Sequence, residues 1–225
     1  MAKKDADRAK QQARERVVAS EAAWADADRL IGDELAALAT RGVTPACTAG
    51  CAHCCRQEIV TARAEAEAVA EWIKRSWDEP RIDAFRGKLR DWLRWYREDY
   101  PKLIAAGVTR SVAFYEHGLQ CVALVDNACS LYAARPLTCR TLYVSSSPDA
   151  CRQETDPQFA KDVTFVPVHA LVRVVEPVHL RIRAVVEKQG ADYMATAHLL
   201  PEWLAHLLRV EDQPWRTTPP LFDKL

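Results

Sequence analysis

The residues of this chain that are best suited to chemistry are its eight cysteines, which fall into two groups along the sequence. Thiolate is the preferred soft ligand of zinc and of iron–sulfur clusters, and both commonly take four such ligands. Eight thiols match two four-ligand sites, or one cluster plus a second role for the remaining thiols. The sequence therefore predicts that zinc or an iron–sulfur cluster, most simply a 4Fe–4S cluster, is bound by Cys47, Cys51, Cys54 and Cys55 with Cys121, Cys129, Cys139 and Cys151.

Cys54 and Cys55 are adjacent in the chain, and this adjacency limits how the thiols can be shared. Cys51 and Cys54 have the two-residue spacing that lets two sulfurs reach one ion from a tight turn, and Cys47 lies just upstream. Neighbouring side chains diverge in helices and strands, so Cys54 and Cys55 are expected to serve different ions or different corners of a polynuclear site. A disulfide between them would be strained. Two nearby centres or one multinuclear centre are the resulting hypotheses.

Arginines stand next to several cysteines in the sequence. Bound thiolates leave a net negative charge, which guanidinium groups can offset while they donate hydrogen bonds to sulfur. We expect this supporting role for Arg56, Arg135, Arg140 and Arg152, although arginine is abundant enough for some of these neighbours to arise by chance. His53 lies inside the first group, but eight cysteines already fill two sites, so we expect His53 not to be a ligand.

Motifs for other chemistry are missing from the sequence. It contains no GxGxxG, Walker, GxSxG or HExxH pattern. Redox chemistry of Cys54 and Cys55 as a vicinal dithiol fits poorly with six further cysteines. Ordinary core or surface positions are therefore expected for His117, His169, His179, His198 and His206.

The charge balance and the lengths of the apolar runs indicate which partners and which location to expect. The 31 basic and 31 acidic side chains balance, whereas a nucleic-acid binder shows a basic excess, so no nucleic-acid partner is expected. No apolar run approaches the roughly 18 residues of a membrane span, and no secretory peptide is recognisable at the N-terminus. We expect a soluble, cytoplasmic protein with no membrane association. In that reducing compartment clustered cysteines favour metal ligation over disulfides.

The hydrophobic pattern predicts a mainly α protein, with helices packed around an irregular cysteine-rich metal-binding centre. Val17, Trp24, Ile31 and Leu38 recur every seven residues, which predicts a long helix over about residues 5–40 with Gly42 as its C-terminal cap. Further helices are expected over residues 61–77, 81–100 and 109–117. In these, Thr61 would be an N-cap and Pro80 a break, and the aromatic stripe over residues 85–100 would pack against a neighbouring helix.

The second cysteine region and the C-terminal third are less regular. Residues 121–125 are expected to be extended and 126–127 to form a turn, with a helix starting at Cys129 and ended by Pro136. A helix is predicted from about His169, with a break or a new start at Pro177, followed by helices over 178–189 and 191–208 and an irregular tail over 211–225. We expect a single domain over residues 1–225, comprising an N-terminal helix (1–44), a cysteine-cluster core (46–152) and C-terminal helices and tail (160–225).

The cysteine pattern resembles that of the YkgJ-type cysteine-cluster family, which is described as zinc- or iron-chelating. The matching features are the 47–55 cluster, the segment Cys121-Val-Ala-Leu, the segment Cys129-Ser-Leu-Tyr-Ala-Ala-Arg-Pro-Leu-Thr-Cys139-Arg140, and Cys151. The first two cysteines are separated by three residues where the family has two, Leu131 replaces the usual Ile, and His53 a small residue. None of these departures removes a candidate ligand. The resemblance covers about residues 47–152 and implies iron–sulfur or zinc binding, but no single reaction.

Three functions are compatible with these observations. The first is a metalloprotein with an iron–sulfur centre in a redox or catalytic role. The second is a zinc-stapled helical module that binds a protein partner. The third, implied by a similar cysteine cluster in flagellin lysine N-methylases, is an enzyme that modifies a protein substrate. Whether the protein is an enzyme stays open at this point, because thiolates suit both metals equally well.

Overall fold

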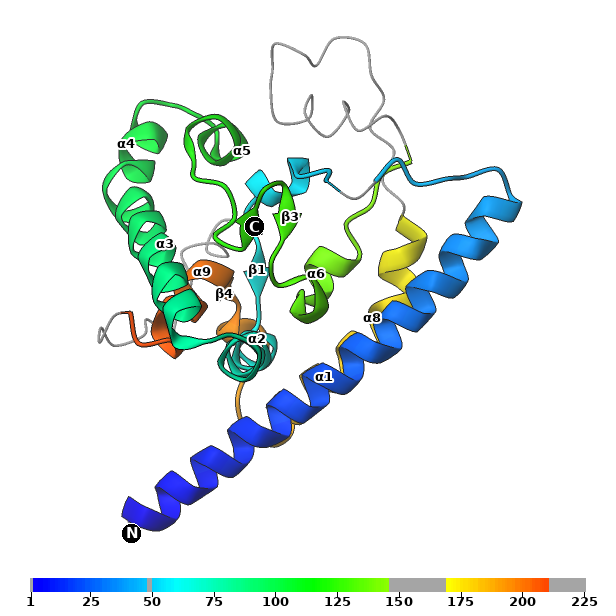
Figure 1. Ribbon diagram of the computed structural model, residues 1–225. Coiled ribbons are helices and arrows are strands. Elements are labelled where there is room, and N and C mark those ends of the chain that lie inside the picture. Colours follow the sequence, from blue (N-terminus) through cyan, green and yellow to red (C-terminus); the bar gives the residue numbers. More distant parts are fainter. Residues whose placement is uncertain (1, 48–49, 146–168, 211–225) are drawn as a thin grey trace.

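Helices form most of the structure, a computed structural model that describes residues 2–47, 50–145 and 169–210 (Figure 1). The prediction of a mainly α protein is confirmed. Two short antiparallel strand pairs accompany the helices. Of the described helices, none combines the length and the apolar character that crossing a lipid bilayer requires.

The long helices α1 (Ala2–Thr40) and α8 (His169–Lys188) lie against each other along one side of the molecule (Figure 1). They are antiparallel, because Arg181 of α8 pairs with Asp26 at 2.5 Å, whereas Gln189, just after α8, donates to the carbonyl of Gln12 at 3.1 Å. The predicted seven-residue stripe faces the core: three of its members are buried and the first is partly buried. Gly42 follows α1 with φ 76°, as expected of a C-terminal cap.

Pro177 lies inside α8, so the predicted break at this residue is wrong. Proline removes one backbone hydrogen bond from a helix and crowds the preceding turn. Here Glu176 and Pro177 are exposed, so water can solvate the backbone carbonyl that loses its partner. Val175, Val178 and Ile182 are buried on the opposite side, and this packing outweighs the local cost.

Helices α2 (Arg63–Ser76) and α3 (Glu79–Glu98) follow in the middle of the chain. α2 packs against α1, and the apolar helix α9 (Leu200–Leu207) packs against both α2 and α3. The prediction that Pro80 breaks the chain between the two helices is wrong, because Pro80 lies in the first turn of α3. Proline suits this position, because its missing N–H has no helical partner there. The N-cap of this helix is Asp78, which accepts from the backbone N–H of Arg81 at 3.1 Å. The aromatic stripe of α3 packs in the core and continues into α4 (Tyr100–Ala105), with Tyr96 stacked on Trp92 and Tyr100.

Thr61 is not the N-cap of α2, contrary to the prediction. It belongs to strand β1 (Val60–Thr61), which pairs antiparallel with β4 (His198–Leu199), and Ala62 takes the N-cap position. The β-branched side chain of threonine suits a strand, and pairing with His198 fixes its backbone. The strand β4 and the 3₁₀ turn η4 (Met194–Thr196) replace the first half of the helix predicted over 191–208.

The cysteine-rich region consists of short elements, as expected. It contains α5 (Arg110–Val112), η2 (Ala113–His117) and a hairpin of β2 (Leu124–Val125) and β3 (Ala128–Cys129). The predicted turn is present: Asp126 and Asn127 have φ 49° and 59°, which a two-residue hairpin turn of type I′ requires. The helix predicted from Cys129 is wrong, because that residue completes the hairpin. η3 (Tyr132–Ala134) and α6 (Leu137–Arg140) follow, and Pro136 precedes α6 instead of ending a helix.

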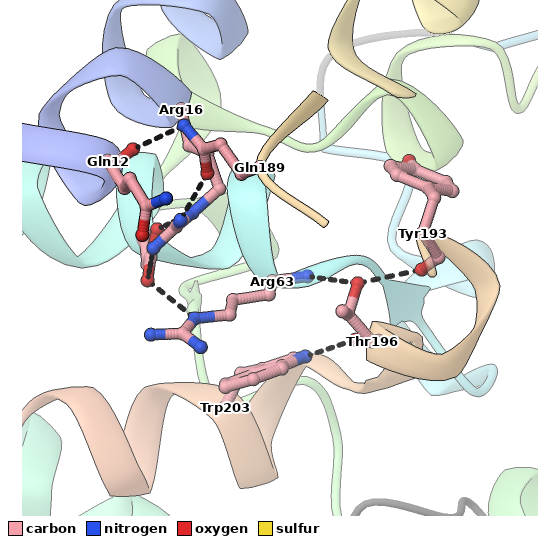
Figure 2. Close-up of polar contacts among 8 residues, drawn as sticks. Gln12, Arg16, Arg63, Gln189, Tyr193, Thr196 and Trp203 are labelled. Carbon is pink, nitrogen blue, oxygen red and sulfur yellow. Dashed lines mark hydrogen bonds and ion pairs between the residues drawn. The ribbon is translucent and has the colours of Figure 1, made fainter. Parts of the chain in front are cut away.

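A buried ion pair joins α1, α2 and the end of α8 (Figure 2). Arg16 donates to both carboxylate oxygens of Glu67, at 2.6 and 2.7 Å, and to the side-chain oxygen of Gln189 at 2.6 Å. Arg63 also donates to Glu67 at 2.7 Å. Arg16 and Glu67 are 7% and 8% exposed, so the pair is held away from water.

We expect Arg16→Met to destabilise the fold by about 3–5 kcal/mol, because it leaves the Glu67 carboxylate buried with only one cation. Urea unfolding of the purified protein measures the change. Arg29→Met is the control: Arg29 pairs with Asp33 in an exposed i,i+4 contact, whose loss costs about 0.5 kcal/mol or less. Equal unfolding midpoints for the two variants would contradict the assignment of Arg16.

We also expect His198 to make stability depend on pH. Burial lowers the pKa of His198 from 6.5 to about 4, since the folded protein disfavours the charged ring. The unfolded chain therefore binds the proton first on acidification. The contribution of the neutral His198 ring to the free energy of unfolding is complete above pH 6.5 and is lost as the pH falls towards 4.

Chemical unfolding at a series of pH values tests this expectation. His198→Gln should flatten the fall in unfolding free energy between pH 6.5 and 4, relative to the wild type. The control His169→Gln changes an exposed residue at the start of α8 and should retain the wild-type slope. An unchanged slope in His198→Gln would show that His198 does not carry this dependence.

Candidate metal centre

The first cysteine segment is a loop between α1 and β1. Cys47 follows the end of α1, and residues 48 and 49 lie outside the described part of the chain. Gly50 has φ 88°, a left-handed conformation that glycine adopts without strain. The 3₁₀ turn η1 (His53–Arg56) then carries Cys54 and Cys55, with the N–H of Cys55 bonded to the carbonyl of Ala52 at 3.0 Å.

The second cysteine segment surrounds the β2–β3 hairpin. Cys121 lies just before the hairpin and accepts at its carbonyl from Leu124 N–H at 2.8 Å. Cys129 lies in β3, and Cys139 lies in α6. Cys151 and Arg152, both predicted to belong to the site, lie outside the described residues.

Two backbone hydrogen bonds join the two segments. The N–H of Cys121 donates to the carbonyl of Cys55 at 2.7 Å, and the N–H of Ala46 donates to the carbonyl of Val144 at 2.7 Å. Figure 1 shows the cyan segment that carries η1 beside the green segment that carries β3. The fold therefore brings together two cysteine segments that are about seventy residues apart in the sequence.

Buried polar contacts hold α6, and with it Cys139, against the long helices. Glu65 of α2 accepts the indole N–H of Trp24 at 3.0 Å and the backbone N–H of Leu137 at 2.8 Å. Arg140, only 1% exposed, pairs with Asp28 of α1. It also donates to the carbonyls of Arg135 at 2.7 Å and Ala133 at 2.6 Å.

Cys54 interacts electrostatically with five other described thiols. A side-chain hydrogen bond from Cys55 lowers the pKa of Cys54 to about 7, with burial opposing the effect and the charge of Arg135 adding to it. The same hydrogen bond raises the pKa of Cys55 far above its ordinary value. Negative charge on Cys54 also raises the pKa values of other thiols, namely Cys47, Cys55, Cys121, Cys129 and Cys139.

Burial is the main reason why the other shifted thiols resist ionisation. It raises the pKa of Cys121 to about 11, and it raises those of Cys129 and Cys139, the latter strongly. Burial also raises the pKa of Cys47, partly offset by a hydrogen bond with the backbone of Val144. A metal that binds these thiols must therefore displace protons, which couples its affinity to pH.

The donor chemistry of this region fits a zinc or iron–sulfur site. The seven described cysteines are all free thiols, and each is partly buried. Within residues 2–47, 50–145 and 169–210, no three Cys, His, Asp or Glu side chains are arranged to hold an ion. Formation of thiolate metal sites is commonly coupled to folding of the segments that carry the ligands.

The predicted arginines differ in their placement. The charge of Arg135 acts on Cys54, Cys129 and Cys139, and its guanidinium lies over the Tyr132 ring at 3.6 Å. Arg56 donates to the carbonyl of Tyr115 at 3.2 Å. The guanidinium of Arg140 is bonded to carbonyls and to Asp28, so it anchors the segment between the two last described cysteines.

His53 and Glu65 are two further residues that contact the cysteine segments or the helices beside them. His53, predicted not to be a ligand, has its Nδ1 3.2 Å from the hydroxyl of Tyr115. Glu65, which positions α6, was not recognised from the sequence. A glutamate in the first turn of a helix usually faces solvent, and only the contact with Trp24 and Leu137 distinguishes this one.

Comparison with protein families gives one match. The CxxCxxCC family, described as a "putative zinc- or iron-chelating domain", matches residues 46–161. The chain belongs to this family. The match spans both cysteine segments, and it confirms the resemblance inferred from the cysteine spacing. Searches of curated proteins and of solved structures gave no significant match.

We expect Cys54 to be the first thiol to react with iodoacetamide in metal-free protein, with a midpoint near pH 7, because the thiolate is the nucleophile. Mass spectrometry of peptides from protein alkylated at a series of pH values measures this. Cys55→Ala removes the hydrogen bond that stabilises the Cys54 thiolate, so its reaction at pH 7 should slow severalfold. The control Cys47→Ala leaves that bond intact. Equal Cys54 reactivity in both variants would contradict the assigned pairing.

Proposed function

We propose that this chain is a metalloprotein in which both cysteine segments hold a polynuclear centre, an iron–sulfur cluster of the 4Fe–4S type, in a redox or catalytic role. The proposal rests on the position of Cys54 among five other described thiols from both segments. A structural zinc ion and a 4Fe–4S cluster each take four thiolate ligands, so the number of thiols is sufficient for either kind of centre. Family membership supports metal binding itself.

The charge around the thiols supports the same proposal. A cluster held by four thiolates carries a net negative charge, and nearby cations and hydrogen bonds adjust its reduction potential. Arg135 supplies such a cation, since its charge favours the ionised forms of Cys54, Cys129 and Cys139. The centre would exchange electrons with a protein partner or a bound substrate in the reducing cytoplasm, where the thiols stay available.

A zinc-stapled module that binds a protein partner is the second candidate. It is favoured by exposed apolar side chains around the second cysteine segment: Leu119 is 42%, Val125 46% and Tyr132 59% exposed. In this case the metal would fix the hairpin against the helices, and the surface beside it would contact the partner. Zinc has no redox chemistry, so the two candidates differ in a directly measurable property.

Iron, zinc and acid-labile sulfide in protein purified without oxygen distinguish the two candidates. The iron–sulfur proposal predicts iron and sulfide in equal amounts and a brown visible absorption. Stoichiometric zinc without iron would overturn it in favour of the zinc module. Absence of both metals would contradict both candidates.

Cysteine variants test which thiols hold the metal. We expect Cys54→Ala and Cys139→Ala each to retain less than half of the metal per folded chain, because each removes one ligand from a site that needs all of them. His53→Ala should load almost fully, since its imidazole bonds to Tyr115. Metal analysis of the monodisperse fraction gives the ratio. Full loading of either cysteine variant would remove that residue from the ligand set.

A further inference from the structure

A second candidate site lies in a cavity of about 570 Å³ between α2, α6 and α8. This volume is in the range of small-molecule sites. Apolar side chains form much of its wall, including Val60, Ala62, Leu137, Val175 and Ala197. None of the described cysteines lines it, so the cavity is separate from the candidate metal centre.

The buried carboxylate of Glu65 is the most unusual group in the cavity wall. Glu65 is 3% exposed, and one of its oxygens accepts from two neutral donors, the indole of Trp24 and the backbone of Leu137. No described cation forms an ion pair with it. A buried carboxylate without a cation is costly, so this position favours a ligand that brings a positive charge.

Thr61 adds an unsatisfied hydroxyl to the same wall. Its Oγ1 is buried and has no hydrogen-bond partner among the described residues. Burial of a hydroxyl without a partner costs free energy, and a ligand that supplies a hydrogen bond recovers it. Thr61 and Glu65 lie four residues apart, at the end of β1 and in the first turn of α2.

Most other polar groups of the cavity are partnered or lie at its rim, although the buried Oε1 of Glu58 has no hydrogen-bond partner among the described residues. Glu58 pairs with Arg110, and the Nε2 of His179 lies 2.8 Å from the hydroxyl of Tyr193. The carbonyl of Tyr193 in turn accepts from the hydroxyl of Thr196 at 2.7 Å, which fixes this part of the wall (Figure 2). Arg173 and Glu176 are exposed and carry opposite charges. After these pairs are set aside, Glu65 is the buried acid without an ion pair among the described residues. Burial raises its pKa, and the hydrogen bonds from Trp24 and Leu137 and the charges of His179 and Arg140 oppose that effect.

We propose that this cavity binds a small organic amine with an apolar body. The ammonium group pairs with the carboxylate of Glu65 and donates a hydrogen bond to the hydroxyl of Thr61. The apolar body lies against Val175, Leu137 and Ala197, where it displaces water from apolar surface. Binding at this site does not depend on which metal the thiols hold.

Three probes with the same apolar body test the choice of ligand class: 4-phenylbutylamine, 4-phenylbutanol and 4-phenylbutyrate. Their dissociation constants are measured by ligand-observed NMR on the native protein as purified. We expect the amine to bind at least about tenfold more tightly than the carboxylate, since only the amine supplies a charge-assisted hydrogen bond. Equal dissociation constants for all three would show that only the phenyl group contributes to binding, and would overturn the proposal. Preference for the carboxylate would overturn it as well.

Two variants test the assigned contacts. Thr61→Val keeps the shape of the side chain and removes a hydroxyl that has no protein partner, so its thermal stability should not fall. Glu65→Gln keeps an acceptor for Trp24 and Leu137 but loses the charge. Both should weaken amine binding, by about threefold for Thr61→Val and tenfold or more for Glu65→Gln, with metal content unchanged.

Matched control variants lie outside the cavity. Thr40→Val changes a threonine at the end of α1, and Glu34→Gln changes a glutamate paired with Arg41 on the surface of the same helix. Both should bind the amine like the wild type. Unchanged amine affinity in Thr61→Val and Glu65→Gln would overturn the assigned site. Loss of metal in Thr61→Val or Glu65→Gln would contradict the separation of the cavity from the metal centre.

Discussion

The structure depends on one buried acceptor, the carboxylate of Glu65, which connects three elements that are distant in the sequence. It accepts from Trp24 of α1 and from the backbone of Leu137 at the start of α6, while its own backbone belongs to α2. Removal of either contact would leave a buried polar group unpaired, which is why the geometry of this junction is strongly determined. Since α6 carries Cys139, the same contact sets where one candidate ligand lies relative to the helices.

The scaffold sets both the positions of the thiols and their protonation. The hydrogen bonds between Cys121 and Cys55 and between Ala46 and Val144 join the two segments, so the thiols approach one another before any metal is considered. Burial then keeps most of them protonated, and Cys54 alone has its pKa lowered among the shifted thiols. This arrangement suits stepwise metal capture, in which Cys54 provides the first thiolate and proton release accompanies each later bond.

The mainly α fold and the family of the cysteine pattern could be predicted because both are encoded in local spacing. The seven-residue spacing of Trp24, Ile31 and Leu38 predicts a helix with one buried face, and all three are buried. The cysteine spacing identified the family correctly. The errors have long-range causes. Thr61 pairs with β4, some 137 residues later, and Pro177 is tolerated because the packing of α8 on α1 outweighs its local cost. The ion pair of Arg140 with Asp28 likewise has no local signal, since its partner belongs to a different helix.

X-ray absorption at the metal edge of the native protein, purified without oxygen, tests most directly whether the thiols of the two segments hold a metal centre. The account predicts an iron edge, a first shell of sulfur atoms at about 2.3 Å, and a second shell of scattering from neighbouring iron atoms. A first shell dominated by nitrogen or oxygen, or the absence of a bound metal, would contradict the assignment of the cysteines as ligands.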